Sequence, residues 1–386
     1  MKKILVIADD FTGAAEIAGI GLRYGLAGVV VRGDAVAQRP HPCPVTVIDT
    51  DSRSLPPKES AARVRRAIQL FRMSDDALLF KKIDSVLRGP VVAEVDAALA
   101  ATGRSSAIVV PANPSRGRII REGHYLVSNV PLDLTEFADD PQYPARTSAV
   151  VDRVGRLPHV HSIDVSAPIR PGIAIGNAES PADMHAWAAR ASPAYLPVGA
   201  ADFFAALLEH AGHHPADQPA TPEAEDRKVL LVSGTPSAVS QSALKNAEEC
   251  GALIRDMPQS VFVGAVAAAD MLAWRDAILG DLHRHGRALV AVRHPVDQAR
   301  TQWVADRLSE AVAAVLSVLS GPSELYVEGG STASRLARHM DWHEFTALRE
   351  LAPGVVCLAI TGQRTRWLTI KPGSYPWPRE IWGRLV

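Results

Sequence analysis

Residues 2–14 read KKILVIADDFTGA, a short apolar run that ends in a cluster of charged and small residues. The pattern recurs within the first 117 residues, where the runs VTVID, ALLF and SAIVV lead into polar segments at 49–53, 81–89 and 111–117. Helix-like segments separate these runs, and this alternation predicts a parallel sheet, five strands up to residue 110, with helices on both faces. In such a sheet the loops share the carboxyl edge, where ligands bind. We therefore expect a polar active site at that edge.

The composition changes at residues 212–228, GHHPADQPATPEAEDRK, which are rich in Pro, Ala and charge and show no apolar period. A second alternation of strand-like and helix-like segments begins with KVLLVSG at 228–234. We expect an N-terminal domain of residues 1–212, a linker of 213–228 and a C-terminal domain of 229–386. The predicted class is α/β, with two α/β/α domains of largely parallel sheet and the active site in the interdomain cleft.

The formal net charge of −1 gives no support for binding to nucleic acid or to a membrane surface. No apolar run is long enough to span a bilayer. The first residues enter a strand-like segment rather than a secretory leader, so a cytoplasmic protein is expected. The three cysteines lack C-x-x-C spacing and the histidines lack partners at zinc-site spacing. No metal site built from protein side chains is predicted.

The polar loops of the first half combine carboxylates with cations. One aspartate of the pair Asp9-Asp10 can cap the following helix, and the second exceeds that need and could take the proton of a substrate hydroxyl. Arginine offers a fork that matches a carboxylate. Both charge types on one edge suit a substrate with an acid group and hydroxyls. The candidate residues are Asp9, Asp10, Arg53, Lys81, Lys82, Asp84 and Arg88.

Three loops of the second half suit a phosphate group. Gly329-Gly330-Ser331-Thr332 follows a strand and opens a helix, whose backbone N–H groups bind anions well. Ser233-Gly234-Thr235 also lies between a strand and a helix, and Lys371-Pro372-Gly373 follows the last strand. The chain has no G-x-x-x-x-G-K-[ST], and it also lacks a complete Rossmann fingerprint, a G-x-S-x-G elbow and a protein-kinase set. The halves therefore suggest an acceptor lobe and a nucleotide lobe.

At these residues the chain resembles the four-carbon acid sugar kinase family, over nearly its whole length. The motifs that carry the resemblance are IADDFTGA (7–14), DTDSR (49–53), KKIDSVLRG (81–89), PANPSRGR (111–118), LTEFADDPQYP (134–144), VSGTPSAVSQ (232–241), EGGSTA (328–333) and IKPG (370–373). The resemblance implies ATP-dependent phosphorylation of a threonate, erythronate or 2-oxo-tetronate at its terminal hydroxyl, with Mg²⁺.

The resemblance also implies site residues. It places the acid at Asp9, Asp10, Arg53, Lys81, Lys82, Ile83 and Asp84, to which the loop reasoning adds Arg88. Asp10 or Asp84 would orient and deprotonate the attacking hydroxyl. ATP would lie at Thr235, Gly329, Gly330, Ser331, Thr332 and Gly373. Two positions depart from the family: Ser331 stands where an acidic residue is usual, and the last turn continues Ser374-Tyr375-Pro376.

Two other functions stay open on the sequence. One is a sugar-phosphate isomerase or phosphatase on the same scaffold, which needs no nucleotide. The other is an inactive binding or regulatory protein, in which Ser331 and the altered last turn mark a lost ATP site. The particular acid, the choice of base among the aspartates and a possible homodimer are not decided by the sequence.

Overall fold

The chain forms two compact units, Met1–Asp217 and Gln218–Val386. The predicted linker, 213–228, contains this division, and its residues 218–226 lie outside the described residues. The computed structural model describes residues 3–34, 41–71, 77–140, 142–217, 227–234, 238–263, 268–293 and 300–384.

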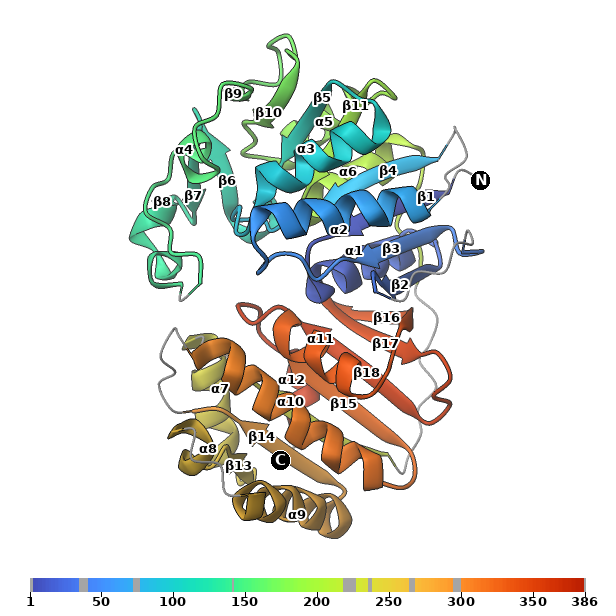
Figure 1. Ribbon diagram of the computed structural model, residues 1–386, viewed down its shortest axis with the longest axis vertical. Helices are drawn as coiled ribbons and strands as arrows, with labels where there is room; N and C mark the ends of the chain where they lie inside the picture. The colour runs from blue at the N-terminus through green and yellow to red at the C-terminus, as the bar shows by residue number, and fades with distance from the viewer. Residues whose placement is uncertain are drawn as a thin grey trace. The chain divides into compact units, whose positions relative to one another are not determined.

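Among the described residues of the first unit, a parallel sheet runs in the order β2-β3-β1-β4-β11-β5-β10-β9 (Figure 1). The five predicted strands are confirmed, and three later strands extend the sheet, with β11 inserted between β4 and β5. The sequence hides β11 because Pro197 lies within it, and proline is unusual in a central strand. The strands are β1 (Ile4–Ala8), β2 (Gly28–Arg32), β3 (Val45–Asp49), β4 (Leu78–Lys82), β5 (Ser106–Val110), β9 (Val160–Ile163), β10 (Gly172–Gly176) and β11 (Tyr195–Gly199).

Helices cover both faces of this sheet. On one face α2 packs against α3, and on the other α1 and α5 pack against α6 (Figure 1). The helix that follows β1 thus lies on the opposite face from those that follow its neighbours β3 and β4, which makes β1 a topological switch point, the place where open α/β sheets bind ligands. The helices are α1 (Phe11–Arg23), α2 (Pro57–Leu70), α3 (Val91–Thr102), α4 (Val150–Arg153), α5 (Pro181–Ala189) and α6 (Ala201–His210).

A small antiparallel sheet interrupts the first unit between β5 and α4. It runs β6-β7-β8 and is joined to the main body by a bridge between Ile120 and Ala178. No strand is predicted from the sequence in this region. Its elements are η1 (Pro114–Arg116), β6 (Arg118–Arg121), β7 (His124–Val127), β8 (Val130–Pro131), η2 (Leu132–Leu134) and η3 (Glu136–Asp139).

The sheet of the second unit is mixed. Its strands run β13-β14-β12-β15-β18-β17-β16; the first five are parallel, and β17 is antiparallel to both neighbours. Neither β13 nor β16 is predicted from the sequence. The strands are β12 (Lys228–Ser233), β13 (Ile254–Asp256), β14 (Arg287–Ala291), β15 (Ser323–Glu328), β16 (Glu344–Ala352), β17 (Val355–Ile360) and β18 (Arg366–Lys371).

The helices of the second unit also lie on two faces. Leu244 of α7 and Ile381 of α12 share one core with Tyr326 and Trp377, while α10 packs against α9 and α11 on the opposite face (Figure 1). The helices are α7 (Ala238–Glu249), α8 (Gln259–Val263), α9 (Ala268–His285), α10 (Thr301–Val318), α11 (Gly330–His339) and α12 (Arg379–Gly383).

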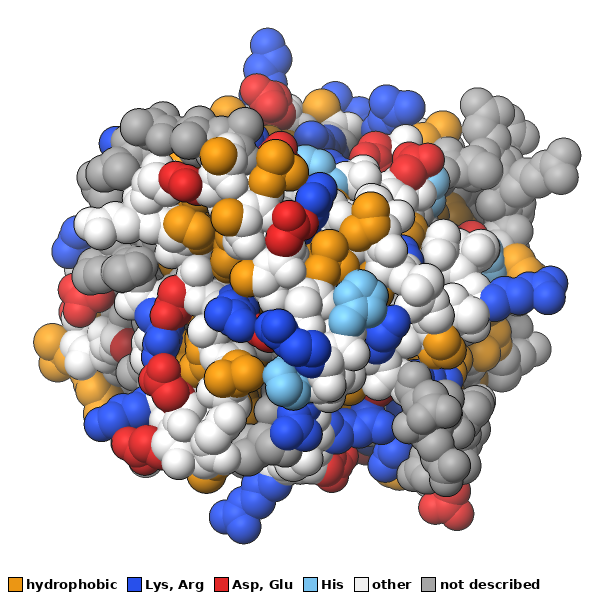
Figure 2. Space-filling view, turned by 90° about the horizontal axis from the view of Figure 1, so that it is seen from below, with side chains coloured by type: hydrophobic (Ala, Val, Ile, Leu, Met, Phe, Trp, Pro, Cys, Tyr) orange, Lys and Arg blue, Asp and Glu red, His pale blue; other side chains and the backbone are white. Residues whose placement is uncertain are grey.

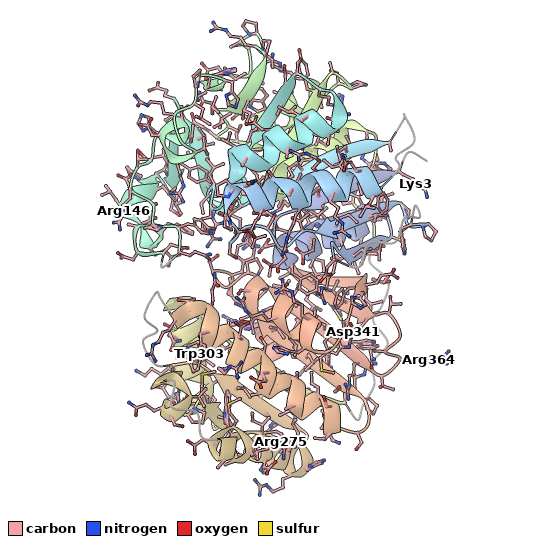
Figure 3. The ribbon with its side chains drawn as sticks, viewed as in Figure 1. Lys3, Arg146, Arg275, Trp303, Asp341 and Arg364 are labelled. Atoms are coloured by element: carbon pink, nitrogen blue, oxygen red, sulfur yellow. The ribbon has the colours of Figure 1, made fainter. Side chains whose placement is uncertain are left out.

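The surface carries charges of both signs. In Figure 2 the described residues of one face intersperse cationic, anionic and apolar side chains. Figure 3 labels several charged side chains that point outward, among them Arg146 in the first unit and Arg275 on α9. Among the described residues, no helix combines the length and the apolar character that a membrane crossing requires.

Gly199 tests how tightly the sheet of the first unit is packed at the end of β11. A Cβ at this position would clash with the carbonyl oxygen of Val110 and lie 2.9 Å from the ring of Phe203. We expect Gly199→Ala to lower the free energy of unfolding by about 1–3 kcal/mol in a denaturant titration. Gly383→Ala is the control, because the methyl group that it adds would have no neighbouring atom within 4 Å among the described residues. Equal stability of both variants would contradict the packing described.

Candidate active site

Asp10 caps the helix that begins directly after β1. Its carboxylate accepts hydrogen bonds from the Gly13 amide at 2.9 Å and from the Thr12 hydroxyl at 2.6 Å. A Cβ on Gly13 would lie 2.6 Å from the Asp10 carboxylate and 3.1 Å from the Lys82 ammonium, so a glycine is needed there. The capping role foreseen for one aspartate of the pair therefore belongs to Asp10.

Arg53, from the loop after β3, joins the aspartates at this edge. Its guanidinium donates to both oxygens of Asp9, at 2.8 and 3.0 Å, and to both oxygens of Asp10, at 2.8 and 2.7 Å. Four of the five N–H groups of an arginine are used in this way. The fifth is on Nη1, which lies 3.7 Å from Asp84. The expected pairing of Arg53 with a substrate carboxylate is thus replaced, in this structure, by pairing with the protein's own carboxylates.

Asp84 organises the loop after β4. It accepts hydrogen bonds from the amides of Val86 and Arg88, at 3.1 and 3.2 Å, and from the Arg88 guanidinium at 3.0 and 2.7 Å. These bonds hold Leu87 at a φ of 60°, a backbone conformation that costs energy outside glycine. Burial alone would raise the pKa of Asp84, but Arg88 and Arg53 outweigh it and hold the pKa far below its usual value. Asp84 is therefore a firmly ionised carboxylate and a weak base.

Asp9 is ionised for the same reason. Its burial would raise the pKa, whereas the charges of Arg53, Lys81 and Lys82 lower it more, so the pKa lies below the ordinary range. The side chain of Asp9 is 5% exposed and that of Asp10 is 14% exposed. Asp10 is thus the aspartate of the pair that a substrate can reach more easily.

The two lysines of the third motif lie below the site. The ammonium of Lys81 contacts Glu94 of α3 at 2.7 Å, with side chains only 1% and 2% exposed, and Glu94 also accepts a 2.6 Å hydrogen bond from Ser52. Lys82 lies 3.3 Å from Glu16 of α1. Neither glutamate was predicted. The available signal was a charged residue on the buried side of an apolar helix, which requires a partner.

The segment inserted between β5 and α4 contributes one wall of the site, through β6 and through the residues in and after η3. Asp140 contacts Arg88 at 3.0 Å, and the Tyr143 hydroxyl donates to the carbonyl of Arg53. Arg118 donates to the Ser85 hydroxyl at 2.7 Å and lies over the Phe137 ring. The motif at 134–144 therefore has a structural role: Asp140 and Tyr143 attach this wall to Arg88 and Arg53 at the carboxyl edge of the sheet.

Arg153 is a further cation beside the Asp84 loop, and the sequence analysis missed it. Its Nε donates to the carbonyl of Val86 at 2.6 Å. In the described part of the chain no carboxylate lies within ion-pair distance of it, although Asp84 and Asp140 act on it from farther away. Partial burial lowers the pKa of Arg153. A half-buried arginine without an ion pair favours the approach of an anion.

The glycine turn of the second unit lies at the end of β15. Gly329 has a φ of 88°, which suits glycine, and its amide donates to the carbonyl of Lys371 at 2.9 Å. Gly234 lies so close to Thr332 that a Cβ would be 2.7 Å from the threonine hydroxyl. The Ser309 hydroxyl donates to the carbonyl of Thr332 at 3.1 Å. The turn is thus fixed from three sides at the start of α11.

The remaining residues predicted for ATP are placed as follows. Ser331 accepts a hydrogen bond from Arg335, which also pairs with Asp306 of α10. Gly373 follows β18 at the same edge as the glycine turn, and Thr235 lies outside the described residues. Among the residues that the structure describes, no group of three His, Cys, Asp or Glu side chains could hold a metal ion.

Comparison with known proteins assigns both units. A family model described as a sugar-binding N-terminal domain matches residues 4–168, and one described as a nucleotide-binding C-terminal domain matches residues 230–375. The fold and the site thus define a protein that joins a sugar-binding domain to a nucleotide-binding domain. The chain belongs to the four-carbon acid sugar kinase family.

Relatives within the family carry different substrate names. The chain is 29% identical over 394 residues to a D-threonate kinase of Salmonella typhimurium, covering 92% of this chain and 90% of the relative. It is 26% identical over 407 residues to a 3-oxo-tetronate kinase of Methylobacterium radiotolerans, covering 96% and 95%. A crystal structure of a Haemophilus influenzae protein has the same fold, with a TM-score of 0.70, 20% identity, and coverage of 99% of this chain and 98% of that one.

The lowered pKa values predict how stability depends on pH. An aspartate whose pKa is lower in the folded protein contributes stability above its unfolded pKa of about 3.9, and this is lost as the pH falls toward the folded value. We therefore expect Asp84→Asn to destabilise the protein at pH 7 in denaturant unfolding, and we expect this difference in stability to begin shrinking only below about pH 4. Asp152→Asn, which breaks an exposed pair, should have little effect at any pH. A pH-independent difference for Asp84→Asn would contradict this assignment.

Proposed function

We propose that the protein is an ATP-dependent kinase that phosphorylates the terminal hydroxyl of a four-carbon sugar acid. The observation that carries the proposal is the cluster of Asp9, Asp10, Arg53 and Asp84 at the switch point of the unit that matches a sugar-binding domain. Aspartates accept hydrogen bonds from sugar hydroxyls, and the surrounding arginines suit an acid. A cluster of this kind supports an acceptor that carries both groups.

Asp10 is the residue we propose as the proton acceptor. Asp9 and Asp84 are less exposed than Asp10, and nearby cations hold the pKa of both carboxyls below its usual range. In the proposed step the hydroxyl oxygen forms a bond to the γ-phosphorus of ATP while the bond from that phosphorus to the β–γ bridging oxygen breaks. The hydroxyl proton passes to Asp10 and ADP leaves. Phosphoryl transfer has a loose transition state, so orienting the hydroxyl matters more than a strong base.

The charge distribution suggests which groups meet the acid. Arg53 has one N–H left and can contact a hydroxyl or one oxygen of the acid, but it cannot form a two-bond clamp while it holds both aspartates. Lys81 is engaged with Glu94 below the surface. We assign the carboxylate of the substrate to Arg153, with Arg88 beside it. Ile83 is buried, and its amide donates to the carbonyl of Gly199, so its contribution is structural.

The nucleotide is assigned to the second unit. The first N–H groups of α11 suit phosphate oxygens, and Gly329, Gly330, Ser331 and Thr332 let the phosphates approach the backbone. Thr235 and Gly373 complete the proposed contacts. Mg²⁺ is held largely by phosphates and water in such enzymes, so it needs few protein ligands, and it would neutralise charge on the phosphates. Three points stay predictions: that the reaction takes place between the domains, that the protein forms a homodimer, and that it is cytoplasmic.

The particular acid is the finer question. The names of the relatives point to threonate and 3-oxo-tetronate, so the 3-oxo acid joins the 2-oxo acid expected from the sequence. The test is ADP release from Mg·ATP with D- and L-threonate, D- and L-erythronate, and the 2-oxo and 3-oxo tetronates. Turnover on one acid supports the kinase and names its substrate. ATP binding without turnover on a broad acid panel would favour the regulatory protein, and turnover of a sugar phosphate without nucleotide would favour the isomerase or phosphatase.

Asp10→Asn tests the proposed base. The amide keeps the shape and one oxygen for the helix cap but gives up one hydrogen bond from Arg53, so stability should fall while ATP binding, assigned to the other unit, stays nearly intact. Turnover should fall by at least about 100-fold, the scale of general-base catalysis, in the ADP-release assay. Asp139→Asn, on the exposed surface of η3, is the control and should leave turnover unchanged. Near-normal turnover in Asp10→Asn would remove Asp10 from the mechanism.

Arg153→Met tests the proposed carboxylate contact. Loss of a charge-assisted pair should raise the KM for the acid about 10- to 100-fold, with the KM for ATP nearly unchanged. Arg156→Met is the matched control, because Arg156 lies three positions further on and pairs only with the exposed Asp152 among the described residues. If both variants keep the original KM for the acid, the carboxylate binds elsewhere.

A further inference from the structure

Three buried polar side chains form a row across the sheet of the second unit. Ser233, Glu328 and Lys371 are the last residues of β12, β15 and β18, and the strand register pairs Ser233 with Glu328 and Glu328 with Lys371. The Ser233 hydroxyl donates to Glu328 at 2.5 Å, and the Lys371 ammonium lies 2.9 Å from the other oxygen of the same carboxylate. The side chains of Glu328 and Lys371 are 2% and 1% exposed.

This row lies where a ligand is expected. The helix after β12 covers one face of the sheet and the helix after β15 covers the other, so the ends of these two strands form the switch point of the unit. Each residue of the row directly precedes one of the turns assigned to ATP. Gly234 follows Ser233, Gly329 follows Glu328, and Pro372-Gly373 follows Lys371.

Lys371 contacts residues of two of these turns, Gly329 and Pro372. Its ammonium donates to the carbonyl of Pro372 at 3.3 Å and lies over the ring of Trp377, 5.2 Å from its centre. Its backbone carbonyl accepts the amide of Gly329 at 2.9 Å. Burial lowers the pKa of Lys371 more than Glu328 raises it. Because burying the charge of Lys371 costs free energy, stability alone is a poor explanation for this ion pair.

The first unit contains a similar set of contacts, although its residues come from the loop after β3, from α3 and from β4. Ser52 donates to Glu94 at 2.6 Å, Glu94 pairs with Lys81 at 2.7 Å, and Lys81 donates to the carbonyl of the next residue at 2.8 Å. There too the trio lies below a set of ligand-binding loops. Two buried Ser–Glu–Lys trios, each beside loops at the carboxyl edge of its sheet, favour a shared task of holding loops rather than an accident of one core.

We propose that the Ser233–Glu328–Lys371 trio is a positioning element for the nucleotide, which fixes the turns at Gly234, Gly329 and Gly373 in the arrangement that receives the phosphates of ATP. The inference rests on the proposed function. Lys371 is too buried to contact the nucleotide, so it acts through the turns. Loss of the trio should weaken ATP binding selectively and leave binding of the sugar acid unchanged, because the acid is bound by the first unit.

The test compares single and double variants in the full-length protein. Lys371→Met leaves the Glu328 carboxylate buried without its cation and is expected to unfold at a lower temperature. The double variant Lys371→Met, Glu328→Gln removes both charges and should regain much of that thermal stability. Its kcat/KM for ATP should nevertheless stay lower by about 100-fold, the scale of a misplaced phosphate group, with the KM for the acid unchanged. Mg·ATP binding by titration calorimetry gives the same comparison without turnover.

The double variant Arg255→Met, Asp281→Asn is the matched control. It removes another ion pair of the second unit, 2.6 Å long with Asp281 1% exposed, between β13 and α9. We expect it to lower thermal stability without changing ATP binding. Wild-type ATP affinity in the double variant of the trio, or equal loss of ATP affinity in the control, would overturn the inference while the kinase stands. No Mg·ATP binding by the unaltered protein would refute the proposed function and this inference together.

Discussion

The bridge from Arg53 to Asp9 and Asp10 is the interaction on which the candidate site depends. Two adjacent carboxylates at the end of a buried strand repel each other and would lose much of their hydration. One guanidinium with four hydrogen bonds makes this pair tolerable, and its Nη1, which carries the remaining N–H, lies 3.7 Å from Asp84. The loops after β1, β3 and β4 are therefore joined by charge. Breaking a buried pair of this kind commonly costs about 3–5 kcal/mol, since one partner stays charged and unpaired.

Charge balance also explains why the lysines lie where they do. Lys81 and Lys82 add positive charge below the aspartates, and each has a glutamate from a neighbouring helix, Glu94 or Glu16. The cations lower the pKa of Asp9 from a distance without occupying the space of a ligand. The second unit repeats the principle with a lysine and a glutamate at its own strand ends. Both units thus have buried ion pairs beside the loops at the carboxyl ends of their strands.

The sequence predicts most of the fold and only part of the site. The ends of strands and the polar loops after them can be predicted from apolar runs, because both depend on residues that are close together in the sequence. The position of β11 between β4 and β5 depends on tertiary structure and cannot be predicted from local sequence. Pro197 within β11 also makes the segment look unlike a central strand. The partner of each charge depends on tertiary structure too, so the sequence signals that the buried Glu94 needs a partner but does not identify Lys81 as that partner, and it does not predict the contacts of Arg153 and Lys371. From the motifs, Arg53 is predicted to bind the carboxylate of the substrate. In the structure, Arg53 instead pairs with the protein's own Asp9 and Asp10.

Arg53 therefore organises the site and has at most one N–H for the substrate. A crystal structure of the protein with a four-carbon acid bound tests this most directly. We predict that Arg53 keeps its hydrogen bonds to Asp9 and Asp10 and that the acid's carboxylate lies beside Arg153. A two-bond clamp from Arg53 to the acid, with either aspartate displaced, would contradict the account.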